Sequence, residues 1–219
     1  MARVVKRGRQ PRTLRAEQAE QTRRRIVDAA RELFLKNGYS ATTIAEISEQ
    51  AGVAVETVYS RFRSKSNLLR AILEIGIVDG DDGRDLLEHP AVAEIRSAPD
   101  QRTQVQLLAA FSRGILERTY TAHRVLRSAA ATDLDAAKLQ QRDTQRRCAG
   151  QRRYIAMLQE KAALRTGLTP EDAADTYSAL ANPSTFAFLV DERDWTPEKY
   201  QHWLADTLAR LLLSPRQAA

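Results

Sequence analysis

Cysteine, histidine and long apolar runs are all scarce in this sequence of 219 residues. Cys148 is the single cysteine, so neither an internal disulfide nor a cysteine-based metal site is available. The 3 histidines match no metal-ligand spacing, and the longest apolar runs have 5 residues, whereas a membrane span needs ~20. We therefore expect a cytoplasmic protein without a metal site, a membrane span or a secretory signal.

Motifs for catalysis are missing as well. The 9 glycines form neither a phosphate-binding loop nor a nucleophile elbow, and no carboxylate pair or activated nucleophile stands in a recognisable pattern. We therefore expect that the protein is not an enzyme and binds no cofactor. Of the functions that we consider, a helical enzyme has the least support.

Positive charge is concentrated in the first third of the chain. The net charge is +6, but residues 1–70 hold 15 basic and 7 acidic side chains, a net charge of +8, which leaves −2 for residues 71–219. Residues 1–16 are basic and have little to bury, so we expect a flexible arm in which Arg7, Arg9 and Arg12 are candidate DNA contacts. The charge favours a polyanionic partner for this third of the chain.

Apolar periodicity predicts helices throughout. The first covers about 17–36, the second follows an N-cap at Thr42 or Thr43 and ends at Gly52, the third runs from about Ala54 to Phe62, and Ser64 caps a fourth. After a polar break at 79–83, helices are predicted over 84–88, 91–97, 100–119, 122–131, 134–165, 170–192 and 197–213, with a kink at Pro183. No stretch alternates like a strand, so the predicted fold class is all-α.

Two short helices joined through Gly52 have the form of a helix-turn-helix motif, whose second helix enters the major groove of DNA. Thr57 and Val55 suit thymine methyl groups and Arg61 suits guanine, whereas Glu56 either accepts from cytosine or repels phosphate. The hydroxyl groups of Thr43 and Tyr59 and the ammonium group of Lys65 suit phosphate contacts. The candidate DNA-binding residues are Thr42, Thr43, Val55, Glu56, Thr57, Tyr59, Ser60, Arg61 and Lys65.

The same stretch resembles the N-terminal pattern of the TetR family of repressors. The matching segments are IVDAARELF (26–34), NGY (37–39), TTIAEI (42–47), AGV (51–53), TVY (57–59), RF (61–62) and SKSNLL (64–69). Two positions depart from the pattern: Ala54 replaces a usual Ser, which removes the side-chain cap of the recognition helix, and Ser48 replaces a usual Ala and can bond back to a carbonyl. The resemblance implies a DNA-binding domain at 17–65, with the motif at about 43–62, and an all-helical effector-binding and dimerisation domain at 66–219.

The resemblance also implies that two terminal helices of each subunit form a four-helix dimer interface. The last helix has an apolar face, and the helix over 170–192 is its expected partner. For each of these side chains an intramolecular core is the alternative interpretation. The candidate interface residues are Tyr177, Leu180, Tyr200, Trp203, Leu204, Leu208 and Leu211.

A ligand cavity among the middle helices is likewise implied by the resemblance. Aromatic and Met residues at helical spacing belong to a core more often than to a pocket. A buried His or Arg among the candidates would favour an anionic or hydrogen-bonding effector. The candidate lining residues are Phe111, Tyr120, His123, Arg124, Tyr154, Met157 and Tyr177.

The sequence therefore predicts a DNA-binding transcriptional regulator, in which a small molecule of unknown identity releases a homodimeric repressor from a pseudo-palindromic operator in double-stranded DNA. The alternative is a nucleoid-type protein that binds DNA without regard to sequence, chiefly through its basic arm.

Overall fold

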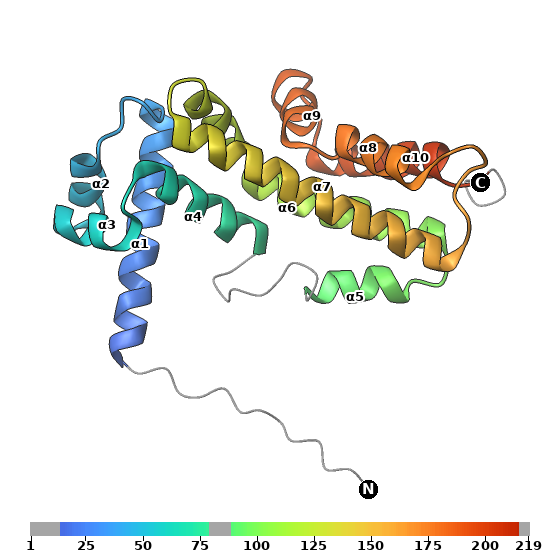
Figure 1. The fold of residues 1–219 in the computed structure, drawn as a ribbon, viewed down its shortest axis with the longest axis horizontal. Coiled ribbons are helices and arrows are strands. Elements are labelled where there is room, and N and C mark those ends of the chain that lie inside the picture. The colour runs from blue at the N-terminus through green and yellow to red at the C-terminus, as the bar shows by residue number, and fades with distance from the viewer. Residues whose placement is uncertain (1–13, 79–88, 215–219) are drawn as a thin grey trace, which may run out of the picture.

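The fold is that of a computed structural model, which describes residues 14–78 and 89–214. Over these residues the chain is built from helices and has no strand, which confirms the all-α fold class (Figure 1). The elements are α1 (Leu14–Asn37), α2 (Ile44–Ala51), α3 (Val55–Phe62), α4 (Lys65–Val78), α5 (Pro90–Ser97), α6 (Gln101–Ala130), α7 (Leu134–Lys161), α8 (Pro170–Leu180), α9 (Pro183–Ala187), the π-helix η2 (Phe188–Glu192) and α10 (Pro197–Leu212).

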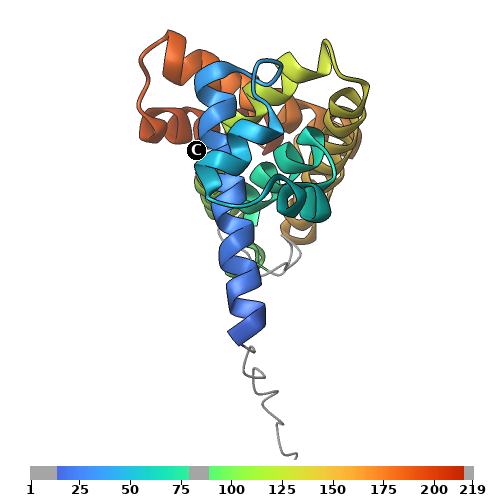
Figure 2. The same ribbon diagram turned by 90° about the vertical axis from the view of Figure 1, so that its left-hand side faces the viewer.

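The N-terminal helices begin and end close to the predicted residues. Thr43 caps α2, Gly52 ends it in the left-handed conformation (φ 62°), and the Ser64 hydroxyl accepts the Asn67 N–H at 3.2 Å at the start of α4. Helix α1 begins earlier than predicted, at Leu14, and its first turns project beyond the other helices (Figures 1 and 2). The arm residues Arg7, Arg9 and Arg12 and the predicted helix over 84–88 lie outside the described residues.

The long helices of the body depart from the prediction in their bounds. Helix α6 is unbroken from Gln101 to Ala130, where the pattern predicts two helices, because neither glycine nor proline interrupts the chain near residue 120. Helix α7 ends at Lys161 rather than 165, since Ala162 is already extended (φ −161°, ψ 166°). None of the described helices is both long and apolar enough to cross a bilayer.

The kink predicted at Pro183 is a complete break. Ala181 leaves helical geometry (φ −98°, ψ 60°), and the Asn182 side chain accepts the N–H groups of Ser184 and Thr185 as a new N-cap. Proline at the first position of α9 lacks only an N–H that would have no partner there. Helix α8 is therefore set off from α9 and η2.

Buried side chains form two clusters. The first joins α1, α2, α3 and α4, and it also includes Ala122, Leu126 and Ala129 of α6 and Ala136 of α7. The second lies between α5, the first half of α6, the second half of α7, and α8 to α10. The corner between α6 and α7 therefore shares one core with the N-terminal helices.

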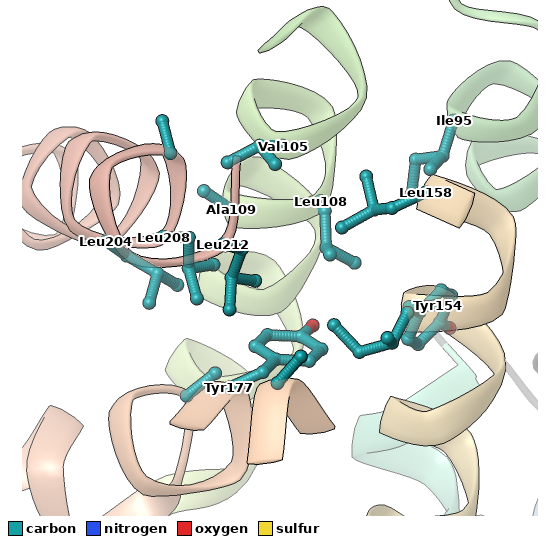
Figure 3. Close-up of a cluster of buried hydrophobic side chains, with 14 of the residues drawn as sticks. Ile95, Val105, Leu108, Ala109, Tyr154, Leu158, Tyr177, Leu204, Leu208 and Leu212 are labelled. Atoms are coloured by element: carbon teal, nitrogen blue, oxygen red, sulfur yellow. The ribbon is translucent and has the colours of Figure 1, made fainter. Parts of the chain in front are cut away.

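The apolar face of α10 fills the second core, which corrects the interface predicted from the sequence. Tyr200, Leu204 and Leu208 are 0% exposed within one protomer, and Tyr177 of α8 is 3% exposed. Figure 3 shows Leu204 and Leu208 in one cluster with Leu108 of α6. These four candidates were wrong because an apolar stripe packs equally well within a chain and between chains. Partial exposure leaves Leu180, Trp203 and Leu211 as candidates.

Candidate functional site

Reciprocal side-chain bonds fix the start of α2. The Thr43 hydroxyl accepts the Glu46 N–H at 3.2 Å, and the Glu46 carboxylate accepts the Thr43 N–H at 2.7 Å, which is a capping box. The hydrogen bonds from Thr43 lower the pKa of Glu46. Thr43 remains exposed at the outer end of the helix.

Helix α1 holds the turn between α2 and α3. The Arg25 guanidinium donates to the carbonyl oxygen of Gly52 at 3.1 Å and also to that of Ala51. A Cβ at Gly52 would lie 2.7 Å from this guanidinium, and the positive φ of 62° disfavours other residues as well. The angle between the two short helices is thus set by a contact with α1.

Helix α3 presents its polar side to solvent. Val58 and Phe62 are buried at 1% and 7% exposure and attach the helix to the first core. The remaining side chains of the helix form an outward face, consisting of Val55, Glu56, Thr57, Tyr59, Ser60 and Arg61. Ala54, the N-cap, makes no side-chain hydrogen bond, as its departure from the family pattern predicts. All the α3 residues proposed to contact DNA therefore lie together on one accessible face.

Thr42 departs from the prediction. Its side chain is 0% exposed, and its hydroxyl donates to the carbonyl oxygens of Gly38 at 2.8 Å and Leu33 at 3.2 Å. A buried hydroxyl with these partners fixes the turn between α1 and α2 and does not reach DNA. The Ser48 hydroxyl bonds back to the Ala45 carbonyl at 2.7 Å, as expected.

Lys65 is committed to the turn between α1 and α2. Its ammonium donates to the carbonyl oxygens of Tyr39 at 2.8 Å, Thr42 at 2.9 Å and Ser40 at 3.4 Å, and it lies 4.6 Å from the centroid of the Tyr39 ring. An ammonium has three donors, so these carbonyls use all of them. The sequence predicts that Lys65 contacts DNA. In the structure its ammonium instead donates to backbone carbonyl oxygens of the same chain.

The same turn is tied to the corner between α6 and α7. The Tyr39 hydroxyl donates to the Asp133 carboxylate at 2.9 Å, and that carboxylate also accepts the N–H groups of Asp135 and Ala136 as the N-cap of α7. The hydrogen bonds from Ala136 and Tyr39 hold the pKa of Asp133 below its usual range despite partial burial. The turn between α1 and α2 is therefore linked to the α6–α7 corner through the side chains of Tyr39 and Ser40, the latter 3.5 Å from the Thr132 hydroxyl.

A cavity of about 320 Å³ lies between α4, α6, α7 and α8. Four of the seven predicted ligand residues line it: Phe111, His123, Tyr154 and Tyr177. Tyr120 and Arg124 instead line a neighbouring hollow of about 230 Å³, which His123 also borders, and Met157 is 3% exposed in the second core. A larger hollow of about 630 Å³ between α4 and α7 is lined mainly by charged and polar side chains.

Three polar side chains that line the cavity contact one another, an arrangement that the sequence analysis did not find. Nε2 of His123 lies 3.1 Å from the Asp143 carboxylate, and Nε of Arg147 donates to the same oxygen at 3.0 Å. Burial alone would raise the pKa of Asp143, but His123 and Arg147 lower it below its usual value. Nδ1 of His123 lies 2.9 Å from the Thr119 carbonyl oxygen, so both ring nitrogens face oxygen acceptors.

Arg146, Arg147 and Arg153 were missed because arginines along α7 read as a solvated helix face. His123 was identified as a polar side chain among the aromatic residues of the middle helices. Its contact with Asp143 spans 20 residues and two helices, so it depends on how α6 and α7 align. Arg124 has 58% of its side chain exposed and contacts Asp191 at 3.3 Å, which makes it no anchor for a buried ligand.

Helices α2 and α3, joined through Gly52, have the geometry of a helix-turn-helix motif. Residues 26–72 match the family model described as "Bacterial regulatory proteins, tetR family". YvkB of Bacillus subtilis, an HTH-type transcriptional regulator, is 46% identical over 52 residues, which are 24% of this chain and 28% of YvkB. TtgR of Pseudomonas putida is 41% identical over 58 residues, 26% of this chain and 28% of TtgR. The match thus spans under a third of these relatives.

Solved structures extend the likeness to the whole fold. SmeT in complex with triclosan has a TM-score of 0.68 at 22% identity, with 89% of this chain and 92% of SmeT covered. A transcriptional regulator from Saccharomonospora viridis in complex with choline has a TM-score of 0.65 at 19% identity, with 88% and 98% covered. Residues 26–72 are therefore similar to the N-terminal domain of the tetR family of bacterial regulatory proteins, and the solved structures share the fold of most of the chain.

Proposed function

We propose that the protein is a ligand-responsive transcriptional repressor that binds a pseudo-palindromic operator as a homodimer. The observation that carries the proposal is the outward face of α3, which α1 and α2 hold in place in a chain that also encloses a cavity. In this proposal residues 17–65 bind DNA, residues 66–219 bind the effector and the second subunit, and the protein acts in the cytoplasm.

The DNA contacts divide by chemistry. Val55 and Thr57 offer methyl groups and Arg61 offers donors to base edges in the major groove. Thr43, the N-cap of α2, and Tyr59, on the exposed side of α3, offer hydroxyl groups to phosphates, and 51% of the Tyr59 surface is exposed. Base contacts set the sequence preference, whereas phosphate contacts set the register.

The second subunit fits against the outer side of α8 and α10. Leu211 is 40% exposed, Trp203 of the same helix is partly exposed, and Phe188 of η2 is 48% exposed. Exposed apolar side chains of this size on α10 and η2 favour a protein contact. Leu211→Glu is expected to shift the mass in solution from dimer to monomer, while Leu14→Glu on the projecting end of α1 leaves it unchanged.

Helix α4 is the proposed connection between the cavity and the DNA-binding helices. Ile77 of α4 lines the cavity together with Thr119 and His123 of α6, and α4 also packs against α1. Arg118 of α6 donates to the Gly76 carbonyl oxygen at 2.9 Å, which ties the end of α4 to α6. A ligand that displaces this end of α4 would alter the spacing of the two α3 helices in a dimer. Small molecules in the structures of SmeT and of the Saccharomonospora regulator support this part of the proposal.

Selection of bound duplexes from a random pool tests the proposal. We expect an inverted repeat, a loss of base preference at one position for Thr57→Ala, and a uniform loss of affinity for Tyr59→Phe. Equal affinity for all duplexes would refute the repressor and favour the nucleoid-type alternative. Removal of residues 1–16 separates the two as well, because only the nucleoid-type protein would lose nearly all affinity.

A further inference from the structure

The apolar part of the 320 Å³ cavity suits a flat organic group. The Phe111 and Tyr154 rings meet edge to face at 6.1 Å between centroids, and Tyr154 meets Tyr177 in the same way at 6.4 Å. Ile115 and Leu116 of α6 complete this side. The volume lies near the lower end of the ~300–1,000 Å³ of small-molecule sites, so it selects a small ligand.

The charged part of the cavity is unbalanced. Arg146, Arg147 and Arg153 line it, and Asp143 is the single acidic side chain among the lining residues that the structure describes. The Asp143 carboxylate already has two partners, because Nε2 of His123 lies 3.1 Å from it and Nε of Arg147 donates to it at 3.0 Å. No carboxylate among the described residues forms an ion pair with Arg146 or Arg153. An organic cation would therefore meet positive charge here without an available counter-ion.

Gly150 leaves the space between these two arginines open. Residues 146, 150 and 153 follow one another at helical spacing along one face of α7, and a Cβ built on Gly150 would meet nothing within 4 Å. Arg146 and Arg153 are both exposed, so they stand at the mouth of the cavity rather than in its interior. Two guanidinium groups on either side of a gap suit a planar carboxylate.

We infer that the effector is a small organic anion, whose apolar part lies against Phe111 and Tyr154 and whose acidic group is bound by Arg146 and Arg153. The inference rests on the proposed function, since it names the chemical class of the ligand that the repressor would sense. Asp143 does not oppose such an anion as a free charge would, because its carboxylate is held by His123 and Arg147.

A series of phenylalkanoates, from phenylacetate to phenylhexanoate, tests the charge, with the matching amines and alcohols as probes of the same shape. Binding to the full chain is measured by calorimetry without DNA. We expect the best carboxylate to bind at least about tenfold more tightly than its amine. Tighter or equal binding of the amine, or no binding of any carboxylate at about 1 mM, would overturn the inference.

Variants of α7 locate the acidic group. Arg146→Gln and Arg153→Gln are each expected to weaken carboxylate binding about tenfold and to leave the alcohol unaffected. Arg152→Gln is the matched control, since Arg152 is exposed on the same helix but does not line the cavity. An equal effect of all three substitutions would overturn the assignment to the cavity mouth.

A separate measurement of operator affinity distinguishes this inference from the proposed function. Carboxylate binding that weakens the complex with DNA supports both. Carboxylate binding with the expected charge preference but no change in DNA affinity refutes the ligand-responsive repressor. Release of DNA by the amine instead supports the repressor and overturns the anionic class of effector.

Discussion

Two helical glycines allow the contact between α4 and α6 to be tested with one kind of substitution. Gly76 lies in α4 where that helix meets α6, and Gly150 lies in α7 with open space around it. Alanine at either position gains about 1 kcal/mol of helix propensity over glycine. The two variants therefore differ only in what the added methyl group meets.

At Gly76 the methyl group meets a side chain that cannot move away. Its Cβ would lie 2.7 Å from Cγ2 of Thr119 and 3.3 Å from the Arg118 carbonyl oxygen. Thr119 is 0% exposed, and its hydroxyl donates to the Ile115 carbonyl at 2.8 Å. Overpacking of this kind costs about 1–3 kcal/mol, so Gly76→Ala should lower the free energy of unfolding by up to about 2 kcal/mol after the gain in propensity.

Thermal unfolding of the two variants and the parent protein gives the measurement. For a chain of this size 1 kcal/mol corresponds to about 2–4 °C, so Gly150→Ala should raise Tm by that amount and Gly76→Ala should leave it unchanged or lower it. A Tm that rises equally in both variants would refute the close approach of α4 and α6. Under the proposed function, Gly76→Ala is also expected to change operator affinity, because α4 packs against both α1 and α6.

Three further predictions concern hydrogen bonds and charge. Tyr39→Phe should lower the free energy of unfolding by about 1–2 kcal/mol, because the buried hydroxyl donates to the carboxylate that caps α7. Tyr59→Phe should leave the free energy of unfolding unchanged. Chemical denaturation measures both variants. Ala54→Ser should stabilise the protein by about 1 kcal/mol, because the serine side chain would cap α3. Thr43→Ala should destabilise it by a similar amount, because it removes the cap of α2. In the double variant the two changes in the free energy of unfolding should add, as measured by the same assay. The folded-state pKa of Asp143 is lowered, so its contribution is fully present above the ordinary carboxyl pKa of about 4 and is lost as the pH falls through the lower folded value. Asp143→Asn should reduce stability at pH 7 by about 1–3 kcal/mol and flatten this acid dependence, and an unchanged profile would refute the pairing.

The sequence predicts local features well and partners poorly. The capping box at Thr43, the turn at Gly52 and the outward face of α3 depend on residues within one or two turns of each other, so their spacing reveals them. The role of Leu204 in the core rather than in a dimer is not accessible in this way, because its spacing in α10 fits both. Asp143 was missed for a different reason, since its partner His123 lies 20 residues away on another helix.

The shared core of the N-terminal helices and the α6–α7 corner limits how such regulators can be recombined. A hybrid that joins residues 1–78 to the body of another regulator would place Leu68, Leu69 and Ile72 opposite side chains that did not evolve with them. Transfer of DNA specificity should therefore succeed more readily by exchanging the outward residues of α3 alone, or by moving the segment around Leu126 together with the head. The part of the chain that can be exchanged between regulators is consequently either smaller than residues 26–72, as with the outward residues of α3, or made of two separate segments.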